Sequence, residues 1–272
     1  MPRRRPKPKD LLDLWIGLFR EHDLMTYATA IAFQALVALV AVALLALAVL
    51  GEIGRGDVWT NQIGPRIEPK VLPEVFSGMT AVVEKIFHTS SVGLIVLASI
   101  IALFELSLVV RTASRAIARI YGQTEDRSWS SRWMTALGIS AAITAAVLGA
   151  ILLATAARTA VHGGWSVPFT AARWLLAAGL ITAGFGVLLR FGPPRPRPTR
   201  WASAGGGLVV LGWIAQTLVF AEYLGLTNYR SAALSLLGVY FLTSYLLVAA
   251  IVLLVGVELN ELIRRDSVSR PR

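Results

Sequence analysis

The longest uncharged stretch of the sequence lies near its C-terminal end. No charged residue occurs from Ala232 to Val257, and Glu258, Asn260 and Glu261 follow directly. As an α-helix with a rise of about 1.5 Å per residue, this stretch is long enough to cross a hydrocarbon core of roughly 30 Å. A helix in the core of a water-soluble protein does not need such a length, so the stretch predicts a membrane-spanning helix.

Five more apolar stretches precede it. The chain is 56% hydrophobic and 15% charged, whereas ordinary soluble domains carry about 25% charged residues. We therefore expect an all-α, polytopic membrane protein with six transmembrane helices. The expected spans are Thr26–Leu50, Val92–Val110, Met134–Ala157, Trp174–Leu189, Ala202–Ala221 and the C-terminal stretch.

The flanking segments divide the chain further. Residues 1–23 are predicted to form a cytoplasmic basic arm and an interfacial helix, residues 24–265 the transmembrane domain, and residues 266–272 a cytoplasmic tail. The arm is rich in proline, arginine and lysine and cannot bury apolar surface. The segment that follows it places Leu11, Trp15 and Leu18 on one helical face, which is typical of a helix lying in the membrane interface.

The longest connection, residues 51–91, has two parts. Gly51–Pro69 is rich in glycine, proline and charge, which predicts an irregular loop. Residues 71–88 repeat apolar side chains at the i, i+3, i+4 spacing of one helical face. This second part also carries Glu74, Glu84 and Lys85, so we expect an amphipathic helix that lies on the outer membrane surface rather than crossing it.

Positive charge indicates the orientation. The chain carries 26 lysine and arginine residues and a net charge of +10. With six spans, most of these residues fall in the loops on the same side as both termini. Cytoplasmic loops are enriched in lysine and arginine, so both termini are expected in the cytoplasm.

Three features predict how the spans pack. Ser203 and Gly207 have the small-xxx-small spacing that lets two helices approach closely. Gln34 and Gln216 are expected to form hydrogen bonds between helices. The alternating proline and arginine of Arg190–Arg200 predict an extended, solvated connection.

Glu105 is the residue most indicative of function. It lies inside the second expected span, where a carboxyl group is costly and is taken by default as functional. It could hold a proton or line a polar pathway. The alternative is a structural glutamate, hydrogen-bonded between helices.

Arg111, Arg115 and Arg119 follow it at intervals of four residues. On a continuous helix they would form one basic ridge, able to bind lipid phosphate groups in a bidentate manner. The alternative is that they serve only as orienting charge, with salt bridges to neighbouring loops.

Glu258 and Asn260 end the last span. We expect Glu258 to pair with Arg111 or Arg115 as a structural clamp, and Glu261 to pair with Arg265 one turn further along the same helix. Both residues nevertheless remain candidates for headgroup binding or transport. Asn228 and Tyr229, ahead of this span, are also candidates, although Asn228 could simply cap the helix.

Several kinds of chemistry lack the residues they need. The chain has no cysteine, and its three histidines, His22, His88 and His162, share no metal-ligand spacing. No phosphate-binding G-x-x-x-x-G-K, G-x-S-x-G or H-E-x-x-H motif occurs. We therefore expect no enzyme activity and no metal or cofactor. No nucleic-acid partner is expected either, because the placement of the basic residues in the loops of one side accounts for the positive charge.

Two blocks resemble the YihY/BrkB family of bacterial inner-membrane proteins. One runs from Asn228-Tyr229 to Gly256-Val257-Glu258-Leu259-Asn260, and the other from Arg111 to Tyr121-Gly122. The chain departs from the family pattern at Ala233-Leu234, where a Tyr-Gly pair is usual. The resemblance implies the bacterial cytoplasmic membrane and a role in envelope integrity. Relatives have been labelled ribonuclease BN, but no acid/base pair or metal cluster for RNA hydrolysis is visible in this sequence.

These observations favour a protein that binds or translocates a lipid or lipid-linked amphiphile. The expected partners are membrane lipids, with a second copy or an envelope protein as further candidates. Two alternatives stay open, namely a proton- or ion-coupled transporter or channel centred on Glu105, and a membrane scaffold that transports nothing.

Overall fold

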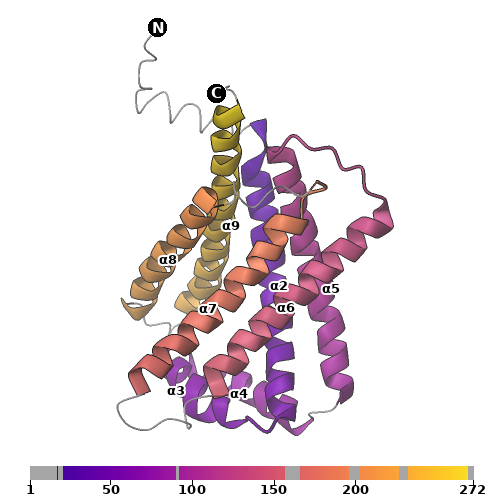
Figure 1. Ribbon diagram of the computed structural model, residues 1–272. Helices are drawn as coiled ribbons and strands as arrows, with labels where there is room; N and C mark the ends of the chain where they lie inside the picture. The colour runs from indigo at the N-terminus through magenta and orange to yellow at the C-terminus, as the bar shows by residue number, and fades with distance from the viewer. Residues whose placement is uncertain are drawn as a thin grey trace.

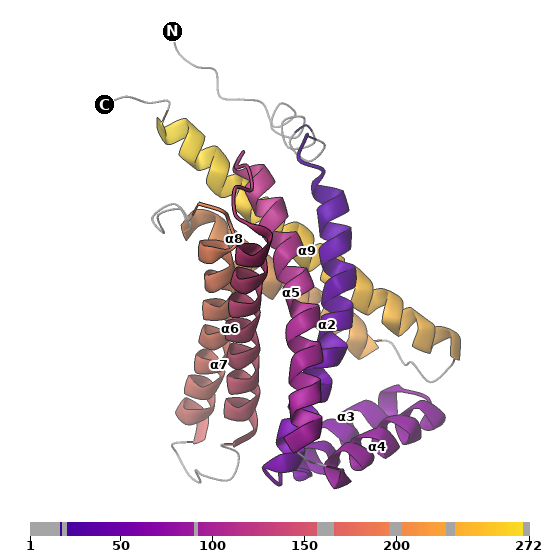
Figure 2. The same ribbon diagram turned by 90° about the vertical axis from the view of Figure 1, so that its right-hand side faces the viewer.

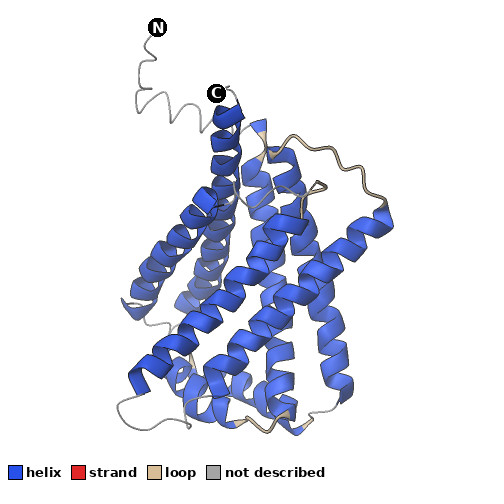
Figure 3. Ribbon diagram, in the orientation of Figure 1, coloured by secondary structure: helices blue, strands red, loops and turns tan. Residues whose placement is uncertain are grey.

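The protein is helical throughout the part that the structure describes. The computed structural model describes residues 17, 21–89, 92–156, 166–195, 203–226 and 232–268. Every regular element in these residues is a helix, and none of them lies in a strand (Figure 3). The long helices are α2 (Leu24–Glu52), α5 (Val92–Ile120), α6 (Trp129–Ala156), α7 (Ser166–Phe191), α8 (Ser203–Leu226) and α9 (Ala232–Val268). The all-α prediction is confirmed.

The hydropathy prediction holds for most of these helices. Within the described residues, α2, α5, α6, α8 and α9 are long and apolar enough to cross a membrane. Large apolar side chains are exposed along them, including Ile100 on α5 and Leu211 and Leu218 on α8. Exposed apolar surface of this extent is unfavourable in water, at about 25 cal/mol per Å². Hydrocarbon is therefore the medium that suits the outside of the molecule.

The long helices pack in pairs, and α2 and α5 connect these pairs. α2 packs against α5, α6 against α7, and α8 against α9, while α2 also contacts α9 and α5 also contacts α6 (Figures 1 and 2). The start of α2 and the end of α9 lie at the same end of the bundle (Figure 1). The short helix α3 (Gly64–Ile67) and helix α4 (Pro73–His88) lie at the opposite end.

The main core is near the end where α2 begins. Leu24 and Ala28 of α2 meet Ile117 and Ile120 of α5 and Leu254 of α9, and all five side chains are buried. A smaller cluster nearer the other end joins α2 to α5. The arrangement makes α2 and α5 the central pair, with the other helices packed on them.

Glycine determines where two helices end. After α5, the amide of Gly122 donates to the carbonyl of Arg119 (3.0 Å) and that of Gln123 donates to Ala118 (2.9 Å). This pair of bonds closes the helix and requires a left-handed residue at Gly122, whose φ is 61°. Gly54 (φ 71°) ends α2 in the same way. Gly122 therefore has a conformational role in the Tyr121-Gly122 block.

The connection after α2 differs from the prediction. Gly51–Pro69 was expected to be irregular, but it contains short helical turns at Trp59–Ile63, Gly64–Ile67 and Glu68–Lys70. Trp59 is buried and stacks on Phe76 of α4 at a centroid distance of 6.3 Å. The prediction of an irregular loop is wrong. Glycine, proline and charge indicate turns, but they do not indicate that Trp59 is buried against α4. A helix does follow, as α4, and it packs against α2.

Two expected spans continue as uninterrupted helices beyond their apolar parts. α5 runs without interruption from the stretch expected in the membrane through Arg111, Arg115 and Arg119. α9 likewise continues through Glu258 to Val268. The charged residues at these ends are therefore held on the same rigid helices as the apolar segments.

The close contact between α8 and α9 uses different glycines from those predicted. A Cβ atom at Gly205 would collide with the carbonyl oxygen of Gly256, and one at Gly212 would lie 2.6 Å from Val252. At Gly207 an added Cβ would meet nothing within 4 Å. The prediction is therefore wrong for Gly207, because small residues occur at several spacings along α8 and only the crossing point of the two helices selects among them.

Candidate functional site

Glu105 lies on α5, one turn beyond a contact of that helix with α2. Ala102, one turn before it, belongs to a buried cluster with Ala41 and Leu45 of α2. The side chain of Glu105 is half-buried and has no hydrogen bond or ion pair with any residue that the structure describes. A carboxyl group in such a position is available to a ligand or a proton.

The two glutamines predicted to join helices behave differently. Gln216 of α8 donates from Nε2 to the carbonyl of Tyr245 on α9 at 2.6 Å, as predicted. Gln34 of α2 makes no side-chain hydrogen bond with the described residues, and its Oε1 atom is buried. For Gln34 the prediction is wrong, and α2 therefore carries a buried acceptor atom with no partner among the described residues.

The basic ridge is not uniform. Arg119 forms an ion pair with Asp23 at 2.9 Å and also reaches the carbonyl of Glu21 at 3.5 Å. Arg111 stacks over the ring of Trp133 at 4.0 Å, and Arg115 is exposed. Arg119 thus serves to hold the start of α2, whereas the other two guanidinium groups hold no carboxylate among the described residues.

Glu258 is paired, but with a residue that the sequence did not indicate. Its side chain is buried, and its Oε2 atom lies 3.2 Å from Nδ1 of His22. The expected partners, Arg111 and Arg115, do not contact it. The reason is that the Leu254 and Val257 face of α9 packs beside the start of α2, which places Glu258 next to the residues just before that helix. Nothing in the sequence around His22, a single histidine ahead of a span, indicates that it pairs with Glu258.

Glu261 holds two arginines of its own helix. Arg264 donates to it from Nε at 2.9 Å and from Nη2 at 2.6 Å, and Arg265 donates from Nε at 3.0 Å. The predicted pair with Arg265 is confirmed, and Arg264 adds to it. The buried carboxylate is thus neutralised locally, so this end of α9 is a structural clamp.

Asn260 also has a structural role. Its Oδ1 atom accepts a hydrogen bond of 2.7 Å from the amide of Gly205, in the first turn of α8. The first four amides of a helix have no partner within it. Asn260 of α9 supplies an acceptor for one of these amides, at the point where the backbones of α8 and α9 approach most closely. Asn228 and Tyr229 lie outside the described residues.

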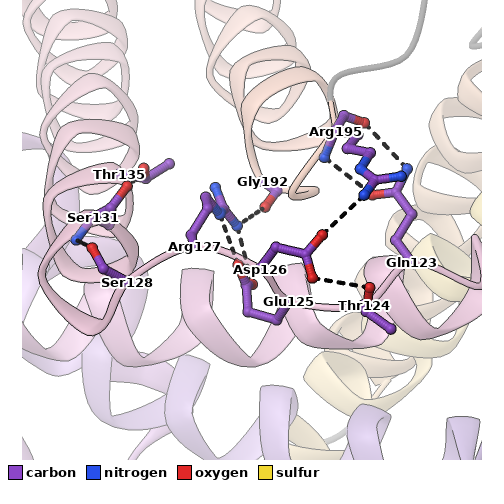
Figure 4. Close-up of polar contacts among 10 residues, drawn as sticks. All are labelled: Gln123, Thr124, Glu125, Asp126, Arg127, Ser128, Ser131, Thr135, Gly192 and Arg195. Carbon is purple, nitrogen blue, oxygen red and sulfur yellow. Dashed lines mark hydrogen bonds and ion pairs between the residues drawn. The ribbon is translucent and has the colours of Figure 1, made fainter.

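A polar clasp joins the loop between α5 and α6 to the end of α7. Arg127 donates to Glu125 (2.8 Å) and to the carbonyl of Gly192 (3.0 Å), as Figure 4 shows. Asp126 accepts from Arg195 at 2.9 Å. The hydrogen bonds from Arg127 lower the pKa of the Glu125 carboxyl.

The clasp corrects the prediction of an extended, solvated Arg190–Arg200 segment. α7 continues to Phe191, and Gly192 and Pro193 are buried. The side-chain amide of Gln123 forms two hydrogen bonds of 3.2 Å with the backbone of Arg195. The composition of this segment indicates an exposed, polar connection. The loop between α5 and α6 that packs over it is distant in sequence and gives no local signal. Residues 196–200 lie outside the described part.

Acidic and histidine side chains do not gather into a metal-binding group in the described part of the chain. No three or more of them are placed there to hold a metal ion. The strongest functional features are the half-buried Glu105, without a partner among the described residues, and Arg111 and Arg115 of the same helix, which hold no carboxylate in that part of the chain.

Comparison with known proteins gives one result. Residues 16–272 match the family model described as virulence factor BrkB. Searches among curated proteins and among solved structures gave no significant match. The family match covers nearly all of the chain, including the two blocks that carry the resemblance. The chain belongs to the virulence factor BrkB family, the YihY/BrkB family of membrane proteins.

Proposed function

We propose that the protein binds a membrane lipid or lipid-linked amphiphile and moves its headgroup through the bundle, as part of maintaining the bacterial envelope. The observation that carries this proposal is Glu105, half-buried on an apolar helix and without a partner among the described residues. Gln34, whose Oε1 atom is buried and unsatisfied on α2, supports it. Polar groups inside a bundle that bind nothing in the protein are suited to a polar substrate group.

In this proposal the chain crosses the cytoplasmic membrane six times, with α7 as the remaining span. Both termini lie in the cytoplasm. The arrangement of the ends supports this, because the start of α2 and the end of α9 lie together and α4 lies opposite (Figure 1). α4 then rests on the outer membrane surface, where its exposed Val75, Met79 and Val82 contact lipid.

The orientation can be tested directly because the chain has no cysteine. Ser130→Cys at the start of α6 and Ser77→Cys on α4 introduce single thiols at opposite ends of the bundle. An impermeant maleimide applied to intact spheroplasts should label the thiol on α4 but not the thiol on α6, and inverted vesicles should show the reverse. Labelling of both thiols from the same side would refute the topology.

Transport is tested by neutralising the interior carboxyl group. In reconstituted vesicles carrying a fluorescent phospholipid, Glu105→Gln should slow movement between leaflets about tenfold or more, since one charge-assisted contact is worth about 1.5–3 kcal/mol. Glu84→Gln on α4 removes an equivalent charge from an exposed position and should have no effect.

Three outcomes would contradict the proposal. One is wild-type movement no faster than in empty vesicles, and another is equal rates in wild type and Glu105→Gln. The third is proton or ion flux in the same vesicles without lipid movement, which would favour the ion-pathway alternative.

A further inference from the structure

Three arginines near one end of α5 and α6 hold no carboxylate among the described residues. Arg111 and Arg115 lie on α5 and Arg132 on α6, and none of their side chains has a hydrogen bond or ion pair with a described residue. By contrast, carboxylates hold Arg55, Arg119, Arg127, Arg195, Arg264 and Arg265. Arg111, Arg115 and Arg132 are called the arginine cluster below.

The members of the arginine cluster share one region of α5 and α6. Arg111 and Arg115 are one turn apart on α5, and Trp133, which stacks on Arg111, follows Arg132 directly in α6. The nearby Glu125 does not balance them as an ion pair, since its carboxylate is engaged by two hydrogen bonds from Arg127. Glu125 attracts Arg132 but forms no ion pair with it, and like charges held together without an ion-pair partner among the described residues are unfavourable. An anion from outside the chain would relieve this repulsion.

Aromatic side chains position the arginine cluster. The Arg111 guanidinium lies over the Trp133 ring, 4.0 Å from its centroid. The Trp133 ring also stacks with Phe104 at a centroid distance of 6.1 Å. Trp129 meets Trp133 edge to face at 5.9 Å. A guanidinium stacked through its flat face keeps its edge N–H groups available for an oxygen ligand. Tryptophan is also enriched at the level of lipid headgroups.

An apolar track leads away from the arginine cluster along the same side of α5. Phe104, Ile100 and Leu97 lie at spacings of three and four residues, on the face that carries Arg111 and Arg115 further along the helix, and all three are exposed. Leu137 of α6 is also exposed. A surface that joins unpaired guanidinium groups to a strip of exposed apolar side chains has the two halves of a phospholipid site.

We propose that Arg111, Arg115 and Arg132 bind the phosphate of an anionic glycerophospholipid whose acyl chain lies along Phe104, Ile100 and Leu97. The site deepens the proposed function and rests on its placement of the chain in a membrane. It does not depend on lipid movement, and Glu105 is not part of it. Two unsatisfied donors fit this assignment, because Nε of Arg132 and Nε1 of Trp133 are buried and find no acceptor among the described residues.

The test uses the full-length protein in detergent and native mass spectrometry. The probes are dioleoyl phosphatidylglycerol and dioleoyl phosphatidylcholine, which share acyl chains and differ in net charge. The wild type should retain phosphatidylglycerol preferentially. Arg111→Gln and Arg132→Gln should each weaken its retention about tenfold, the loss expected for one charge-assisted contact.

A matched control is available on the same helix. Arg119→Gln removes the same charge one turn beyond Arg115, but Arg119 already holds Asp23. It should leave phosphatidylglycerol retention unchanged. Arg132→Lys keeps the charge without the planar fork of donors and should recover part of the binding. Because this variant retains a cation, it also guards against a fold defect in Arg132→Gln.

Three results would overturn the site. Equal retention of the two lipids by the wild type would show that the site does not distinguish lipids by their net charge. Equal losses in Arg119→Gln and Arg132→Gln would show a diffuse charge effect. Displacement of the lipid by millimolar inorganic phosphate or glycerol phosphate would assign the arginine cluster to a soluble phosphate compound. Loss of retention in Arg132→Gln with lipid movement intact would support the site and separate it from the transport proposal.

Discussion

The crossing of α8 and α9 makes a quantitative prediction at Gly205. Alanine at this position would place a Cβ atom against the carbonyl oxygen of Gly256 and against the side-chain amide of Asn260. Backbone atoms cannot rotate away, so the two helices must separate. That separation also breaks the hydrogen bond of 2.7 Å from the Gly205 amide to Asn260.

The magnitude follows from these two losses. Overpacking a tight contact costs about 1–3 kcal/mol, and the hydrogen bond contributes about 0.5–1.5 kcal/mol. Replacing glycine in a helix also gains about 0.8–1 kcal/mol in propensity. Gly207→Ala in the same helix gives this gain alone, because its Cβ would meet nothing within 4 Å. The difference in unfolding free energy between the two variants should therefore be roughly 2–4 kcal/mol.

The assay is reversible denaturation in mixed detergent micelles, with helix content followed by circular dichroism. Gly205→Ala should unfold at a lower denaturant fraction than the wild type, and Gly207→Ala at the same fraction or higher. Asn260→Ala, which loses the hydrogen bond without a steric clash, should lie between Gly205→Ala and the wild type. If Gly205→Ala and Gly207→Ala were equally stable, the close approach of the two backbones would be refuted.

Two other predictions concern polar contacts. Hydrogen bonds from Arg127 hold the pKa of Glu125 below its ordinary value of 4.5. The stability that these bonds contribute is therefore fully present above pH 4.5, and it is lost as the pH falls through the lower pKa of the folded state. Glu125→Gln should remove this part of the acid-side decline in an unfolding series across about pH 3–6, and an unchanged decline would count against it. The hydroxyls of Ser107 and Ser140, 3.2 Å apart and buried, should show a coupling energy of about 0.6 kcal/mol in a double-alanine cycle, because each also donates to its own helix. A coupling above about 2 kcal/mol would show that the pair carries more than this contact.

The positions of the long helices could be read from the sequence because they depend on local composition. A run such as Ala232–Val257 must satisfy its backbone polar groups internally wherever it meets hydrocarbon, and a helix does this without any partner. The Glu261 and Arg265 pair was predictable for the same reason, since a spacing of four residues places two side chains on one helical face. The candidate positions Glu105, Arg111 and Arg115 came from the cost of charge next to apolar runs.

The partners in contacts between distant segments were not predictable. Glu258 was expected beside an arginine and instead meets His22, which is 236 residues away in sequence. The buried Gly192 and Pro193 were expected in solvent, because nothing local indicates that Gln123 and Arg127 fold over them. Each of these outcomes depends on which helix faces lie together.

By itself, the sequence determined an all-helical chain with apolar spans, the charges that flank them and the family to which it belongs. Only the tertiary structure decided which of those charges are neutralised. It paired Arg119 with Asp23 and left Arg111, Arg115 and Arg132 without a carboxylate among the described residues. The physical reason is that hydropathy and periodicity act within one helix, whereas the environment of a charge is set by the neighbouring helices packed around it.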